Sequence, residues 1–171
     1  LYSDEEIAAL LQTASHLKPT DGLHPRTYVT LFGLLVSTGL RISEALNLAR
    51  EDVDLKTNII TITRTKFKKS RLVPISSSAS QALQDYLTFR DACHPGAKAE
   101  RFFISENGIS LNYRQVLYVF INLRPNLGWT DTGKRPPRIH DFRHTFAVRR
   151  LLKWVEEGKS LDRKILALSV Y

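Results

Sequence analysis

RIHDFRHTFA, the stretch from Arg138 to Ala147, places two histidines and two arginines close together in the chain. Pro136 and Pro137 come directly before it, and because proline cannot continue a helix from within, they predict a loop that ends where a new helix begins. Residues three apart lie on the same side of a helix, so His140 and Arg143 should project together from its first turns. Helix N-termini favour anions, which makes this pair a candidate phosphate site. The alternative is a polar helix face that only contacts water.

Length and composition indicate one soluble domain. At 171 residues the chain is long enough for one hydrophobic core and too short for two comfortable domains. Hydrophobic residues make up 43% and charged residues 25%, an ordinary globular mixture. No apolar run approaches a membrane span, and the N-terminus lacks the layout of a signal peptide. The single cysteine, Cys93, excludes an internal disulfide and a cysteine-built zinc site, so we expect an intracellular protein with no membrane partner.

The charge balance favours a polyanionic partner. Lys plus Arg is 25 against 17 for Asp plus Glu, which gives a net charge of +8 and a pI near 9.8. A surplus of this size is typical of proteins that bind nucleic acid, although a basic soluble protein without such a partner is the alternative. The surplus is concentrated in two runs, which are Arg64, Lys66, Lys68, Lys69 and Arg71, and then Lys134, Arg135 and Arg138.

The N-terminal part of the chain is predicted to form helices with a charged junction between two of them. Ser3 and Glu6 have the spacing of a capping box before an amphipathic helix. The apolar run from Tyr28 to Val36 predicts a helix buried in the middle of the domain. Arg41 follows this helix closely and shares a face of the next one with Glu44. The two form either a surface ion pair or an arginine held by a carboxylate beside a substrate anion, and the junction favours the second interpretation.

Between Val53 and Ile75 the hydrophobic period changes to two, which predicts a small antiparallel sheet. The runs Asn58 to Thr63 and Arg71 to Ile75 are the main strands, and residues 53–55 form a possible short third one. Pro74 predicts that the last strand lies at an edge of the sheet. A lysine-rich tip is also typical of an ordinary soluble turn. The lysines at this tip are Lys66, Lys68 and Lys69.

Three more helices are predicted in the rest of the chain. The first runs from Ser77 to Arg90, the second is capped by Ser110, and the third carries His140. The residues expected to face the core are Ala82, Leu83, Tyr86 and Leu87, then Val116, Leu117, Phe120 and Ile121, and finally Phe142, Phe146 and Leu151.

An arginine at a helix junction, a lysine on a β-hairpin and His-x-x-Arg-His on a late helix follow one another along the chain. This set resembles the catalytic domain of the tyrosine recombinases, the phage integrase family. TGLRISEAL resembles the first box of that family, which makes Arg41 the first catalytic arginine and Glu44 its acidic neighbour. IHDFRHTFA resembles the second box, with His140 and Arg143 as the catalytic pair and His144 in support. The implied fold is mainly α-helical with a small antiparallel β-sheet, the DNA breaking-rejoining fold.

The hairpin TKFKKSRLVPI resembles the family's catalytic hairpin. The register set by its final Val-Pro selects Lys66 as the catalytic lysine over the two lysines that follow. The basic residues around the two boxes are then expected to contact DNA. These are Arg64, Lys68, Lys69, Arg71, Lys134 and Arg138.

The resemblance implies site-specific DNA recombination or integration by cleavage and rejoining through a 3′-phosphotyrosyl intermediate. Two guanidiniums would bind the non-bridging oxygens in a bidentate way, a histidine would assist proton transfer, and Lys66 would protonate the departing 5′ oxygen. No metal or other cofactor is required in this family. The implied partner is double-stranded DNA, with a homotetrameric synapse in the full-length protein, and the implied location is the bacterial cytoplasm at the nucleoid.

Two departures from the family pattern lead to further expectations. The family continues with a Leu-Gly-His box and then the nucleophilic tyrosine, whereas ALSVY, ending at Tyr171, matches the residues just before that box. We therefore expect residues 1–171 to be a catalytic domain that is incomplete at the C-terminus, and to be monomeric and inactive alone in this form. The N-terminal core-binding domain of the family is also expected to be absent.

Three other functions compete with this hypothesis. A zinc hydrolase would use His140 and His144 at i and i+4, but Arg143 between them would repel a cation. A non-catalytic DNA-binding module fits the charge but leaves the arginine, lysine and histidine set unexplained. A type IB topoisomerase shares the chemistry, although the compact boxes are more similar to those of an integrase.

Overall fold

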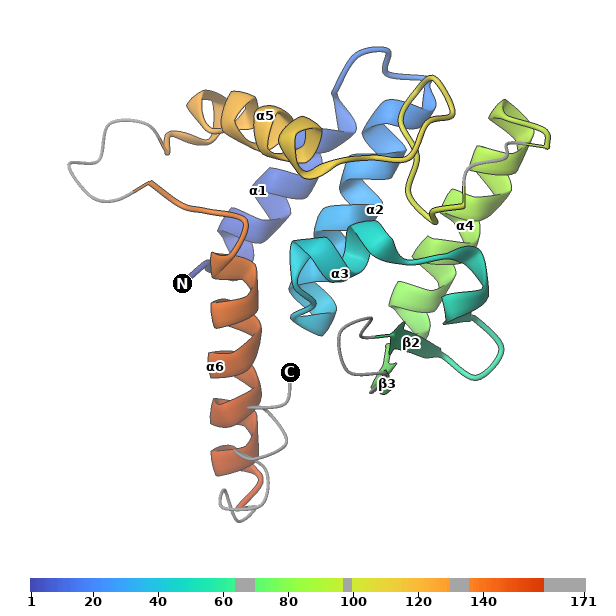
Figure 1. The fold of residues 1–171 in the computed structure, drawn as a ribbon. Coiled ribbons are helices and arrows are strands. Elements are labelled where there is room, and N and C mark those ends of the chain that lie inside the picture. Colours follow the sequence, from blue (N-terminus) through green and yellow to red (C-terminus); the bar gives the residue numbers. More distant parts are fainter. Residues whose placement is uncertain (64–69, 97–99, 130–135, 159–171) are drawn as a thin grey trace.

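The structure is a computed structural model that describes residues 1–63, 70–96, 100–129 and 136–158. It is mainly helical with a three-stranded antiparallel sheet, so the predicted fold class is confirmed. Figure 1 shows the arrangement. The elements are α1 (Asp4–Ser15), α2 (Leu23–Thr38), α3 (Ile42–Asn47), η1 (Arg50–Asp52), β1 (Val53–Asp54), β2 (Ile59–Thr63), β3 (Ser70–Pro74), α4 (Ser77–Cys93), α5 (Tyr113–Leu123), η2 (Pro125–Leu127) and α6 (Asp141–Glu156).

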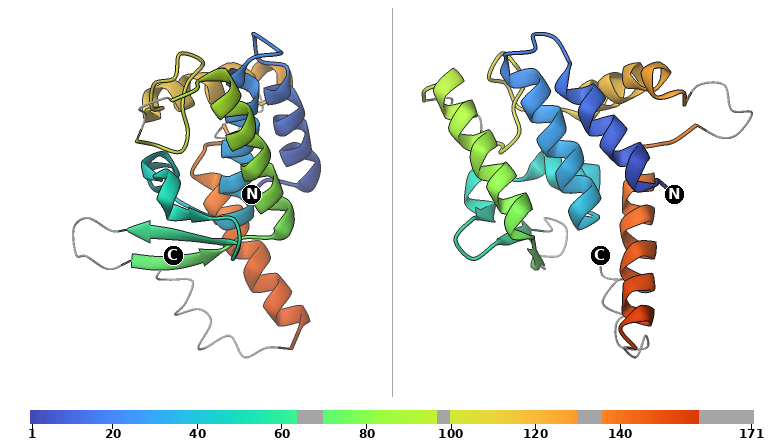
Figure 2. Two further views of the ribbon diagram at one scale, coloured as in Figure 1. Left: turned by 90° about the vertical axis from the view of Figure 1, so that its right-hand side faces the viewer. Right: turned by 180° about the vertical axis from the view of Figure 1, so that it is seen from behind.

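Helix α2 is the centre of the domain. It lies between α1 and α4 and also contacts α6, as both views in Figure 2 make clear. Tyr28, Leu31, Phe32 and Leu35 are all at most 2% exposed, which confirms the predicted buried helix. The ring of Phe32 packs against those of Phe120 and Phe142, with centroids 5.9 and 6.1 Å apart. This aromatic cluster joins α2 to α5 and to the start of α6.

The predicted start of α1 is confirmed and that of α5 is corrected. Ser3 Oγ accepts from the Glu6 amide at 3.2 Å, and the Glu6 carboxylate accepts from the Ser3 amide at 2.8 Å. Ser110 does not cap α5, because it forms an isolated bridge with Ile104. The cap is Asn112, which forms a reciprocal pair with Gln115.

The buried stripe of α5 differs in part from the prediction. Val116 and Phe120 are fully buried as expected, but Ile121 is 44% exposed. Val119 and Leu123 are buried in its place. The buried face of α5 is therefore rotated about the helix axis relative to the predicted one, because the contacts of Phe120 with Phe32 and Phe142 fix the orientation of the helix.

The sheet has the order β1–β2–β3, so β3 is an edge strand and Pro74 lies there as predicted. The pairing of β2 with β3 runs from Ile59 opposite Pro74 to Thr63 opposite Ser70. Ile60, Ile62 and Val73 face the core. Residues 64–69, which join the two strands, lie outside the described part.

Two predictions for the helices around α2 need correction. Ala82 on α4 is exposed rather than part of the apolar face, because its small side chain lines a hollow of about 260 Å³ between α2 and α4. On α6, Phe142 is buried as predicted, but Phe146 and Leu151 are only half-buried. The reason is visible in Figure 1, where α6 extends beyond the other helices after its first turns.

None of the described helices combines the length and apolar character needed to cross a bilayer.

A glycine makes the turn that ends α2. Gly39 has φ +67° and its amide donates to the Leu35 carbonyl at 2.9 Å. Left-handed backbone of this kind favours glycine. The space beside it is also closed, because a Cβ built on Gly39 would overlap the ring of Phe146. Both the backbone and the packing therefore require glycine directly before the segment that carries Arg41.

Replacing Gly39 by alanine should destabilise the fold. We expect Gly39→Ala to lower the free energy of unfolding by about 1–3 kcal/mol, from the strained φ and the collision with Phe146. Gly33→Ala in the middle of α2 is the matched control, because no atom lies within 4 Å of a Cβ there. That variant should be neutral or up to about 1 kcal/mol more stable. Urea denaturation measures both, and equal effects of the two variants would contradict this account of Gly39.

Candidate active site

Arg41 is fixed by the turn between α2 and α3. It occupies the N-cap of α3, and its backbone amide donates to Glu44 Oε2 at 2.8 Å. Its guanidinium Nη1 donates to Glu44 Oε1 at 3.1 Å. The Arg41 side chain is 42% exposed, whereas that of Glu44 is only 12% exposed. The pair is therefore an arginine held at the surface by a mostly buried carboxylate.

A second arginine reaches the same carboxylate from the sheet. Arg71 on β3 donates through Nη1 and Nη2 to the two oxygens of Glu44, both at 2.8 Å. Burial opposes ionisation of Glu44, but the hydrogen bonds from Arg71 and from the Arg41 amide outweigh it and lower the pKa of this carboxyl to about 2. Glu44 is therefore an anion at any physiological pH.

The start of α6 is organised by Asp141. Its carboxylate accepts from the Arg138 amide and from Arg138 Nη2, each at 2.9 Å. These hydrogen bonds outweigh the effect of burial and lower the pKa of Asp141. Arg138 is thereby paired, with 40% of its side chain exposed, at the entry to the helix.

His140 and His144 lie one helical turn apart and pack edge to face, with ring centroids 4.8 Å apart. Burial lowers the pKa of His140, and the nearby charges of His144, Arg143 and Arg138 lower it further. An imidazole in this positive surrounding is held mainly neutral near pH 7, which lets it accept a proton.

Arg143 connects the two boxes. Its Nη1 donates to the carbonyl oxygen of Gly39 at 2.7 Å, although the two residues are 104 positions apart. Gly39 lies only two residues before Arg41, so α6 brings Arg143 to the segment that presents Arg41. Of the four residues predicted to be catalytic, the structure thus places Arg41, His140 and Arg143 on two adjoining helix starts.

Tyr2 supports this arrangement and was missed by the sequence analysis. Its hydroxyl donates to the Arg138 carbonyl and its amide to Thr145 Oγ1, each at 2.9 Å. Its ring packs against Trp129 and Phe142. An apolar residue directly before an N-cap does signal local packing, but no sequence signal indicates that it reaches α6.

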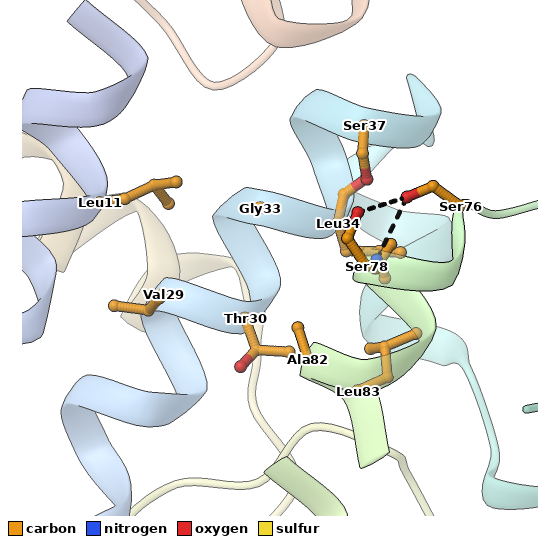
Figure 3. A pocket seen from close by; sticks show the side chains of 11 residues that line it. Leu11, Val29, Thr30, Gly33, Leu34, Ser37, Ser76, Ser78, Ala82 and Leu83 are labelled. Carbon is orange, nitrogen blue, oxygen red and sulfur yellow. Dashed lines mark hydrogen bonds between the residues drawn. The ribbon is translucent and has the colours of Figure 1, made fainter. Parts of the chain in front are cut away.

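Several predicted site residues lie outside the described part of the chain. They are Arg64, Lys66, Lys68, Lys69 and Lys134. The hollow beside α2 is lined by none of the predicted site residues, and Figure 3 shows it bordered by Thr30, Gly33 and Ala82. Within the described ranges, no three His, Cys, Asp or Glu side chains are grouped to hold a metal ion, so His140 and His144 have no third ligand there.

Glu44→Gln should make the fold less stable in a pH-dependent way. The folded-state pKa of about 2 lies below the ordinary value of 4.5, so ionised Glu44 stabilises the fold above pH 4.5 and this contribution is lost as the pH falls toward 2. We expect the free energy of unfolding of the wild type to exceed that of the variant by about 3 kcal/mol at pH 7. Near pH 2 the two free energies should differ little.

Denaturant unfolding at several pH values measures this difference. Glu51→Gln, at an exposed position of η1, is the control, and its free energy of unfolding should stay close to that of the wild type at every pH. A difference between wild type and Glu44→Gln that stays constant from pH 7 to pH 2 would mean that the charge of Glu44 does not stabilise the fold.

Comparison with known proteins gives a consistent assignment. The chain matches the phage integrase family over residues 2–156. It is 36% identical, over its whole length, to a Sinorhizobium fredii protein described as an integrase/recombinase (y4rE), of which it covers 54%. It is 34% identical over 92% of its length to the tyrosine recombinase XerC of Chlamydia caviae, of which it covers 46%. The chain therefore spans about half the length of the curated relatives that it matches.

Solved structures show the same fold. The crystal structure of XerA recombinase superimposes with a TM-score of 0.72 at 24% identity, covering 94% of this chain and 52% of that one. XerH recombinase bound to a difH substrate gives a TM-score of 0.68 at 21% identity, covering 92% and 44%. The family match includes the Arg41 box, the hairpin and the His140 box, and the chain belongs to the phage integrase family of tyrosine recombinases.

Proposed function

We propose that this chain carries the phosphate-activating site of a site-specific recombinase, which breaks and rejoins DNA through a 3′-phosphotyrosyl intermediate. One observation supports this function above the others. The hydrogen bond from Arg143 to the Gly39 carbonyl places the arginine of the second box beside the segment that carries Arg41. Two guanidiniums on adjoining helix starts are suited to bind one phosphodiester group.

The proposed chemistry is an in-line exchange of one phosphate ester for another. A tyrosine oxygen attacks phosphorus, the bond to the 5′ oxygen breaks, and that oxygen leaves with a proton from Lys66. Arg41 and Arg143 stabilise the charge that develops on the non-bridging oxygens. His140, held neutral by its surroundings, accepts the proton that the tyrosine hydroxyl loses as it attacks. The reverse reaction, with a DNA hydroxyl as nucleophile, rejoins the strand.

DNA contact is proposed for the basic residues around these boxes. The net charge of +8 supports a polyanionic partner. A structural neighbour, the Tn1549 transposon integrase, was solved in complex with transposon right-end DNA. We propose phosphate contacts for Arg64, Lys68, Lys69, Lys134 and Arg138, and a tetrameric synapse for the complete recombinase. Arg71 is left out of this set because both of its terminal nitrogens donate to Glu44.

DNA binding tests the proposal directly. We expect weak binding of duplex DNA with little sequence preference, and an affinity that falls steeply as salt is added. Arg143→Ala should weaken binding and reduce the slope of log K against log salt by about one, because a phosphate contact is lost. Fluorescence anisotropy titrations at several salt concentrations measure both quantities.

Arg26→Ala is the matched control. Arg26 is exposed, stacks on Phe89, and lies near the other end of α2, roughly 20 Å along the helix axis from Gly39. The Arg26→Ala substitution removes the same charge as Arg143→Ala but should leave the slope of log K against log salt unchanged. Binding that does not respond to salt, or equal effects of the two variants, would argue against a phosphate site at Arg143.

We propose that the nucleophile is none of Tyr2, Tyr28, Tyr86 and Tyr118. Tyr2, Tyr28 and Tyr86 are buried, and burial raises the pKa of each phenol, that of Tyr28 to about 12. An attacking tyrosine has to reach the phosphate and lose its proton, which these environments oppose. Tyr118 is 69% exposed but lies two residues from Phe120, so it points away from the face of α5 that meets α6.

We expect none of these four tyrosines to form a covalent adduct when the chain is mixed with nicked duplexes of randomised sequence. Denaturing gels followed by mass spectrometry would detect a phosphotyrosyl product. An adduct that disappears in Tyr118→Phe would contradict the exclusion of Tyr118, and one that disappears in Tyr113→Phe would identify Tyr113, which is 49% exposed, as the nucleophile. One that disappears only in Tyr171→Phe would identify that residue, which lies outside the described part, as the nucleophile.

A further inference from the structure

We infer that Arg71 is a positioning residue: by holding both oxygens of Glu44, it keeps Arg41 available for a DNA phosphate. This inference rests on the proposed function of the site. It assigns to Arg71 a role that differs from the direct DNA contact expected from its place in a basic run. Three features of the described residues support it.

The first feature is how the carboxylate of Glu44 is shared. Arg71 donates to both of its oxygens at 2.8 Å, and the Arg41 amide donates to Oε2 at the same distance. The Arg41 guanidinium is left with a single, longer hydrogen bond of 3.1 Å to Oε1. A carboxylate has about four acceptor positions, so these contacts leave no room for Arg41 to pair with it through two nitrogens.

The second feature is exposure. The Arg71 side chain is 12% exposed, like that of Glu44, whereas the Arg41 side chain is 42% exposed. Along β3, Arg71 and Val73 face inward, and Leu72 between them is 62% exposed. The strand period therefore directs Arg71 toward α3 and away from solvent, while Arg41 stays accessible to an incoming anion.

The third feature is the charge that this sharing leaves behind. Two guanidiniums around one carboxylate carry a net charge of +1, and the buried Arg71–Glu44 pair largely compensates itself. The excess positive charge is thus presented by the more exposed Arg41. Without Arg71, Glu44 would be free to pair with Arg41 in the bidentate geometry that arginine and carboxylate prefer, and Arg41 would be neutralised.

The same contact links the hairpin to α3. Arg71 is paired with Ile62 across the β2–β3 ladder. This pair is next to Thr63–Ser70, the last pair before the residues that connect the two strands. Its two hydrogen bonds to Glu44 therefore tie the end of the strand pair that leads into residues 64–69 to α3, the helix that presents Arg41. A change in strand register would move Arg71 off the carboxylate and alter Arg41 with it.

A double-mutant cycle on duplex DNA binding tests this role. Arg71→Lys keeps the positive charge but cannot bridge two carboxylate oxygens as a guanidinium does. If Arg71 acts through Arg41, Arg71→Lys should lower the affinity for DNA about threefold or more and reduce the salt slope by about one, which is also the result expected of Arg41→Ala. In the Arg41→Ala background, Arg71→Lys should then have no further effect.

The opposite results would overturn the inference. Wild-type affinity in Arg71→Lys would show that any cation at position 71 suffices. Arg71→Gln provides the second test, because it removes the charge altogether. If Arg71→Gln lowers affinity and slope equally with Arg41 present or replaced by alanine, Arg71 contacts phosphate by itself. Urea denaturation of each variant, at the temperature of the titrations, ensures that only folded protein is compared.

Failure of this inference is distinguishable from failure of the proposed function. If Arg41→Ala and Arg143→Ala weaken DNA binding but the Arg71 variants do not couple to Arg41, only the positioning role is wrong. If neither Arg41→Ala nor Arg143→Ala changes binding relative to Arg26→Ala, the phosphate site itself is wrong.

Discussion

The hydrogen bond between Arg143 and the Gly39 carbonyl is the contact on which the site depends. Gly39 ends α2 with a positive φ that other residues adopt at a cost, and Phe146 closes the space beside it. The turn therefore favours glycine, and its carbonyl accepts a hydrogen bond from Arg143 on α6. Because Arg41 follows two residues later, fixing this turn also fixes the guanidinium of the first box relative to that of the second.

Two carboxylates organise the positive charge around this turn. Glu44 holds Arg41 and Arg71, and Asp141 holds Arg138, and in each case hydrogen bonds keep the acid ionised despite burial. Arg71, which is only 12% exposed beside its carboxylate, serves the fold, whereas Arg41 and Arg138 stay about 40% exposed beside theirs and can still meet a ligand. Exposure, rather than position in a basic run, thus separates the two roles.

Local rules predicted much of this fold from sequence. The Ser3–Glu6 capping box, the buried run of α2, the three strands and Pro74 at the sheet edge all follow from contacts between near neighbours. The local rules failed where distant elements intervene. Asn112 rather than Ser110 caps α5, because Ser110 pairs with Ile104, and Ala82 is exposed, because α2 leaves a hollow opposite it.

By itself, the sequence determined the residue types of the site and the order of its boxes, since arginine, lysine and histidine chemistry is a property of the side chains. It placed Arg41 beside Glu44 and His140 beside Arg143, because spacings of three residues are local helix geometry. Only the tertiary structure decided that Arg143 reaches the Gly39 carbonyl, that Tyr2 holds the Arg138 carbonyl, and that Arg71 turns inward to Glu44. These contacts join residues far apart in the chain, and their geometry is set by how α2, α6 and β3 pack together, which no local pattern encodes.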